Sequence, residues 1–133
     1  MKKLLLVLFC LVLFGSVSYA AGPTKKVFFV EPKNGAVVTS PFKVVFGVTG
    51  MVVEPAGEIK PDSGHHHLLI NAGPMKEGET IPADATHLHF GKAQTETEVT
   101  LPPGKYALTM QFANGAHQSY GEKMSATINI TVK

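Results

Sequence analysis

The chain has 133 residues, a length that suits one small domain with a single hydrophobic core once a short leader is set aside. Its formal net charge of +2 is due to Lys2 and Lys3, so the remainder is neutral and lacks the basic stripe that a nucleic-acid partner requires. The single cysteine, Cys10, lies in the apolar N-terminal run, which excludes disulfides, iron–sulfur clusters, thiolate nucleophiles and cysteine-rich zinc sites from the rest of the chain.

The N-terminus has the three parts of an export signal. Lys2 and Lys3 precede an apolar run, residues 4–14, that is too short to cross a bilayer. Ser18 and Ala20 then occupy the two small-residue positions that signal peptidases recognise. We therefore expect residues 1–20 to be removed, and residues 21–133 to form a single periplasmic or secreted domain with no membrane span after cleavage.

From residue 27 onward, apolar and polar side chains alternate with a period of two, which is typical of strands whose side chains point to opposite faces of a sheet. Turn signals such as Asn34-Gly35 and Pro102-Pro103-Gly104 separate the alternating runs. The expected strands are, in chain order, residues 27–30, 42–48, 66–70, 88–90, 96–101, 106–112 and 124–132.

About seven short strands with such turns between them predict an all-β fold, an immunoglobulin-like antiparallel β-sandwich. Residues 71–86 are rich in glycine, proline and charge, which predicts a surface loop. No internal repeat or linker divides residues 21–133, so the sequence predicts one domain.

All six histidines fall between residues 65 and 117, and five of them lie in two strand-like pieces, residues 64–70 and 86–90. Alternate residues of a strand share a face, with Cα atoms about 6–7 Å apart. His65 and His67 therefore form one potential pair, and His87 and His89 form another, with the apolar neighbours of the second pair facing the core.

The two other histidines are harder to place from the pattern. His66 shares its face with the apolar residues that follow it, so either it is half buried or the strand begins after it. His117 follows a strong Asn-Gly turn, and it reaches the other histidines only if its segment folds over them.

Neutral imidazole binds copper, zinc, nickel and iron, and a His-x-His strand supplies two such ligands at about 2 Å from the metal. The candidate metal ligands are His65, His67, His87, His89 and His117. We expect copper in first place and zinc in second, with Asp84 or Glu96 orienting one of the imidazoles. Because the ligands must be neutral, binding should weaken below about pH 6.

These residues leave three functions open. The first is a carrier, buffer or accessory protein for a transition metal, and the second is a non-catalytic module that recognises an envelope protein, a glycan or haem with its histidine face. The third is an enzyme that activates a metal-bound water. The sequence contains no nucleophile elbow, phosphate loop or His-Glu-x-x-His helix, so we expect a binding protein and assign no catalytic residue.

Several longer motifs resemble those of a known family. Residues 64–70 (GHHHLLI), 81–84 (IPAD), 87–91 (HLHFG) and 101–104 (LPPG) are similar to segments of the domain of unknown function 4399 family of secreted bacterial proteins. The resemblance extends over nearly all of residues 21–133 and implies a periplasmic or secreted β domain without an established activity. Relatives often carry a second histidine-rich stretch after the last motif, where this chain retains only His117.

Overall fold

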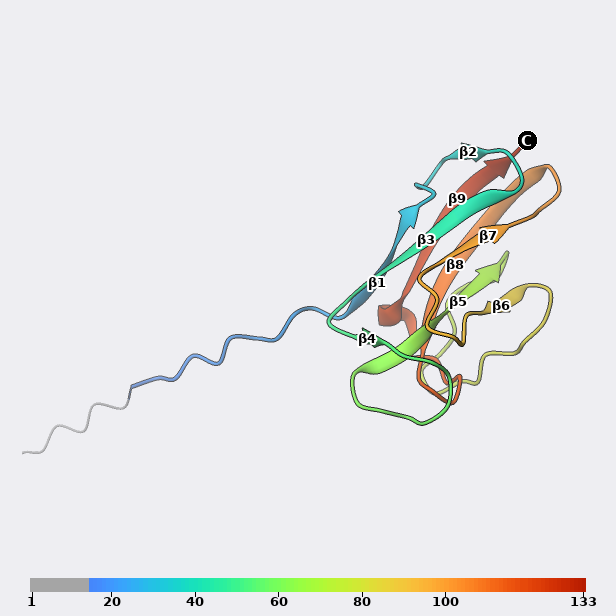
Figure 1. The fold of residues 1–133 in the computed structure, drawn as a ribbon. Helices are drawn as coiled ribbons and strands as arrows, with labels where there is room; N and C mark the ends of the chain where they lie inside the picture. The colour runs from blue at the N-terminus through green and yellow to red at the C-terminus, as the bar shows by residue number, and fades with distance from the viewer. Residues whose placement is uncertain (1–14) are drawn as a thin grey trace, which may run out of the picture.

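The computed structural model describes residues 15–133 (Figure 1). The expected signal peptide, residues 1–20, therefore lies largely outside the described residues. Residues 15–25 are exposed and have no regular structure, and they lead away from the folded part, which begins at Lys26. Within residues 15–133, no helix is long and apolar enough to cross a membrane.

The smaller sheet contains three antiparallel strands in the order β1-β3-β7. Alternation places one face of this sheet against the core: Val27 and Phe29 of β1 are buried, whereas Lys26 and Phe28 are exposed. The bounds are β1 Lys26–Glu31, β3 Phe42–Thr49 and β7 Glu96–Val99.

The larger sheet has the order β2-β9-β8-β5-β4, and β6 also pairs with β5. The pairings β8–β9, β5–β8 and β5–β6 are antiparallel, whereas β2–β9 and β4–β5 are parallel. A short 3-10 turn, η1 Glu122–Met124, leads into β9. The bounds are β2 Val37–Val38, β4 Val52–Val53, β5 Ser63–Ile70, β6 His87–His89, β8 Gly104–Ala113 and β9 Ser125–Val132.

The core lies between the two sheets and contains apolar residues from both. Val44 of the smaller sheet and Leu68, Leu108, Met110 and Phe112 of the larger one are fully buried there. Burying the apolar face of each sheet against the other is what stabilises a sandwich. The all-β sandwich predicted from the alternating pattern is thus confirmed.

The number and direction of the strands differ in detail from the prediction. Nine strands occur among residues 15–133, against about seven expected, because β2 and β4 are only two residues long. Segments this short carry no period-two signal, and both pair in parallel, β2 with the distant β9 and β4 with the next strand, β5. The strand predicted at residues 66–70 begins earlier, at Ser63, and so includes all three consecutive histidines.

Two loop segments, residues 71–86 and 114–121, cover the outer face of the larger sheet over β5 and the end of β8, and we call them the covering layer. Gln111 on this face is fully buried, and its Oε1 accepts a hydrogen bond of 3.0 Å from the backbone N–H of Met75. The two segments also bond to each other, since the N–H of Ile81 donates to the carbonyl of His117 at 2.9 Å. Residues 71–86 form a surface loop, as expected, and their inner side closes over the sheet.

Candidate metal centre

The three consecutive histidines of β5 divide between the two faces of the larger sheet. His66 points into the sandwich core, where its ring stacks on Phe46 with a centroid distance of 4.9 Å and meets Phe112 edge-on at 5.0 Å. His65 and His67 point to the outer face, beneath the covering layer. Both sequence-based alternatives for His66 were therefore wrong: the ring is fully buried, and the strand starts before it.

The register between β5 and β6 decides which histidine of β6 joins this pair. His89 lies opposite His67, whereas His87 lies opposite Leu69. Opposed residues of an antiparallel pair share a face and sit close together. The register therefore brings His89 to the two outward histidines of β5 and places His87 beside an apolar residue further along the strand.

His117 arrives from the covering layer and not from a strand. Its backbone has φ 63°, an unusual left-handed conformation for a residue with a side chain. The Asn114 side chain holds the turn, because its Oδ1 accepts from the N–H groups of Ala116 and Gln118, both at 3.0 Å. With the backbone so held, the Nδ1 atom of His117 lies 3.1 Å from Nε2 of His65.

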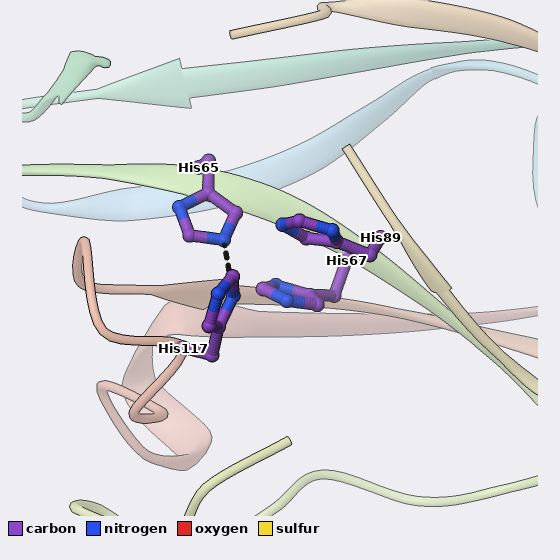
Figure 2. Close-up of side chains that lie close together, drawn as sticks. All are labelled: His65, His67, His89 and His117. Carbon is purple, nitrogen blue, oxygen red and sulfur yellow. Dashed lines mark hydrogen bonds between the residues drawn. The ribbon is translucent and has the colours of Figure 1, made fainter. Parts of the chain in front are cut away.

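These four residues form one group, which we call the histidine cluster (Figure 2). One ring nitrogen from each residue lies within 4.8 Å of those of the others. Four nitrogens bound to one ion at about 2.0–2.1 Å are about 3–4 Å apart, so small side-chain shifts bring the rings to that geometry. The group could hold a metal ion. Its members are His65, His67, His89 and His117.

Burial keeps the inner imidazoles of the cluster neutral. Loss of solvent, together with the smaller effect of the neighbouring histidines, lowers the pKa of His65 to about 4 and that of His67 to about 3. The pKa of His89 is lowered for the same two reasons. Neutral imidazole has a free lone pair, which is the form that binds a metal.

Two ring nitrogens in the cluster lack a protein partner. Among the described residues, Nδ1 of His65 and Nδ1 of His67 have no hydrogen-bond partner although both side chains are buried. Buried polar atoms are almost always paired, and an unpaired one needs an explanation. An unpaired imidazole nitrogen beside three other imidazoles fits a metal ligand.

His87 lies outside the cluster, although the sequence pattern proposed it as a ligand. Its Nδ1 lies 2.8 Å from Oδ1 of Asp84, which also accepts a hydrogen bond from the N–H of Thr86 at 2.8 Å. These bonds, with that of His87 in first place, lower the pKa of the Asp84 carboxyl to about 2. The expected contact between Asp84 and an imidazole is therefore present, but it is made to a histidine that the cluster does not include.

Two features of the site were missed by the sequence analysis. Gly91 lies directly against the imidazole of His89, where a side chain would collide with the ring. Ile81, Pro82 and Ala83 line a small cavity beside the cluster. The IPAD and HLHFG motifs contain all of these residues, but only the fold shows what they contact.

The family model described as a domain of unknown function (DUF4399) matches residues 44–133. The chain belongs to this family. The match includes every residue of the histidine cluster and the whole of the covering layer. A search of curated proteins finds no match to this DUF4399 protein, and neither does a search of solved structures.

Proposed function

We propose that this DUF4399 protein is a periplasmic or secreted carrier, buffer or accessory protein for a transition metal, with copper preferred to zinc, bound through the histidine cluster. The observation that carries the proposal is the convergence of four imidazoles from three separate segments, β5, β6 and the covering layer. A polar surface pair on a single strand would not require this convergence.

The position of the unpaired nitrogens favours a metal over a purely structural network, because those of the cluster lie among converging imidazoles, whereas those of His66 lie among the phenyl rings of the core. In a structural network each buried donor or acceptor is satisfied, because an unsatisfied one costs about 1–3 kcal/mol. His65 and His67 are 0% and 1% exposed, and within residues 15–133 the Nδ1 atom of each has no partner. A bound ion would use these lone pairs or reorient the rings so that they are used.

The donor set supports copper before zinc. All four candidate ligands are imidazoles, which both Cu(II) and Zn(II) accept, and a given site of this kind binds Cu(II) more tightly than Zn(II). Zinc would suit the same four donors in a tetrahedral arrangement.

A carrier or accessory role also requires exchange of the ion with a partner. His89 is exposed and His117 is partly exposed, so one side of the cluster is accessible from solvent while His65 and His67 lie beneath it. An envelope protein that delivers or receives the ion belongs to this proposal, as does export, which rests on the signal pattern of residues 1–20.

Metal titration of single-site variants tests the proposal. Mature protein, first stripped with a chelator, is titrated with Cu(II) and separately with Zn(II) in competition with a chromogenic chelator. We expect one ion per chain, and a loss of affinity of at least about 10–100-fold in His67→Ala and in His89→Ala. His87→Ala is the matched control, because it removes a histidine of the same strand that lies outside the cluster.

Binding by the unaltered protein that is no tighter than binding by His89→Ala would overturn the proposal. Suppose that protein purified from the periplasm contains no metal but captures an envelope partner through the same histidines. That result would support the partner-binding module instead.

A further inference from the structure

A small cavity of about 120 Å³ lies against one side of the histidine cluster. Its lining residues are His67, His89, His117, Ile81, Pro82 and Ala83. The fourth member of the cluster, His65, does not line it, so the cavity faces only one side of the group. A single water needs about 10–15 Å³ of such space, so the cavity has room for a small polyatomic ligand.

The cavity is reachable from solvent. Pro82, Ala83 and His89 are exposed, whereas Ile81 is buried beneath them. A ligand that enters here meets three imidazoles at once. The side chains of Ile81, Pro82 and Ala83 provide no hydrogen-bond donor or acceptor. A ligand in the cavity is therefore held mainly by the histidine cluster and the metal bound there.

The charge of the four metal-binding side chains indicates what kind of ligand the cavity would take. Four neutral imidazoles add no negative charge, so a divalent ion brings two uncompensated positive charges to a site with two buried ligands. Such a charge is costly unless it is paired. Asp84 follows the cavity residue Ala83 in sequence, but its carboxylate is engaged by His87 and Thr86. An anion from solvent can supply this compensation.

We infer that the metal bound in the histidine cluster keeps one coordination position directed to this cavity, and that a small monovalent anion occupies it. The inference rests on the proposed function and adds an exogenous ligand to it. Cu(II) with four imidazoles in a tetragonal arrangement accepts a fifth ligand of this kind. The lining side chains other than histidine provide no acid or base, which favours anion binding over hydrolysis by a metal-bound water.

Azide titration of the copper-loaded protein tests the inference. Cu(II)-loaded mature protein, with its copper content measured before and after, is titrated with azide while the charge-transfer absorption and the electron paramagnetic resonance spectrum are recorded. We expect saturable binding of one azide per copper, with the copper retained.

Two leucine variants locate the anion. Ala83→Leu fills the cavity and should weaken azide binding by at least about tenfold while copper affinity is kept. Ala85→Leu, an equally exposed alanine of the same loop that does not line the cavity, should bind azide as the unaltered protein does.

The outcomes separate the two proposals. Absence of tight copper binding contradicts the proposed function itself. Tight copper binding with no response to azide, or with equal azide affinity in Ala83→Leu, contradicts only the anion site. If Ala83→Leu also loses copper, anion binding by the unaltered protein is compared for two carboxylates of different size. Formate should bind at least about tenfold more tightly than diphenylacetate, which is larger than the roughly 8–12 waters that the cavity can hold, and equal binding overturns the inference.

Discussion

The imidazole of His89 has almost no free space on the side of Gly91. A Cβ atom added at residue 91 would overlap Cε1 and Nε2 of that ring, and it would also approach Ala56 at 3.2 Å. The collision is with the end of a mobile side chain, so the ring would move before the backbone does. Glycine at this position therefore determines where His89 points.

The first prediction concerns this contact. Gly91→Ala should turn the His89 ring away from the cluster and lower Cu(II) affinity by about 10–100-fold, the range found when the support of a ligand is lost. The free energy of unfolding should change by less than about 1 kcal/mol, since the strand backbone is unaffected. Chelator competition and urea unfolding measure the two quantities.

Gly73→Ala is the control for this change, because a Cβ at residue 73 has no neighbour within 4 Å among the described residues. It should leave copper affinity unchanged. A Gly91→Ala protein with full affinity would contradict the view that residue 91 positions His89.

At the level of elements, Gln111 joins β8 to the covering layer. Its side chain is fully buried; Oε1 accepts from the N–H of Met75, and Nε2 donates to the carbonyl of Gly121 at 3.0 Å. It also lies opposite His67 on the same face of the sheet. The segment that contributes His117 is therefore held to the sheet beside the cluster by this side chain, as well as by the hydrogen bond that the N–H of Tyr120 donates to the carbonyl of Phe112 in β8 at 3.1 Å.

The second prediction follows from these bonds. Gln111→Met keeps the length of the side chain but leaves the Met75 N–H and the Gly121 carbonyl without this partner, which should lower the free energy of unfolding by about 1–3 kcal/mol. Looser attachment of residues 71–86 and 114–121 should also make their amide hydrogens exchange faster, and bound copper should dissociate faster.

Gln94→Met provides the comparison, since within residues 15–133 the Gln94 side chain accepts a bond only from Lys92, in its own loop. It should change the free energy of unfolding by no more than about 0.5 kcal/mol. Equal stability and equal copper dissociation rates in the two variants would show that Gln111 does not hold the covering layer in place.

For the whole molecule, the buried histidines make stability depend on pH. Burial lowers the pKa of His65 and His66 to about 4 and that of His67 to about 3, against 6.5 for the ordinary group. At high pH all three are neutral in both the folded and the unfolded chain. Between about pH 6.5 and 4 the unfolded chain takes up protons that the folded chain does not, so acid favours unfolding.

The third prediction is a fall in the free energy of unfolding of the metal-free protein as the pH decreases from 6.5 to about 4. Each buried histidine contributes up to about 1.4 kcal/mol per pH unit. His66→Leu should reduce the slope by about one proton, because it removes a histidine whose two ring nitrogens have no partner within the described chain. Urea unfolding at a series of pH values measures the slope, and an unchanged slope in the variant would contradict the explanation.

The same lowered pKa values modify the expected pH dependence of metal binding. Exposed imidazoles release a metal below about pH 6, as they take up protons. In the folded protein, protons compete less well for His65 and His67. The metal should therefore stay bound to a lower pH than the sequence alone suggested. Retention of copper at pH 5 is the corresponding observation.

Much of the fold follows from short-range pattern. Period-two alternation predicted the positions of β1, β3, β8 and β9 to within a few residues, because burial of one sheet face imposes that period locally. The same reasoning placed His65 and His67 together on one face, as the structure has them.

The composition of the histidine cluster depended on contacts that a local pattern does not contain. His87 and His89 are equivalent in period, and only the pairing of β6 with β5 places one beside His67 and the other beside Leu69. His117 reaches His65 across 52 positions of the chain because hydrogen bonds hold its loop over the sheet. Strand register and loop docking arise from long-range packing, so they emerge only when the whole domain has folded.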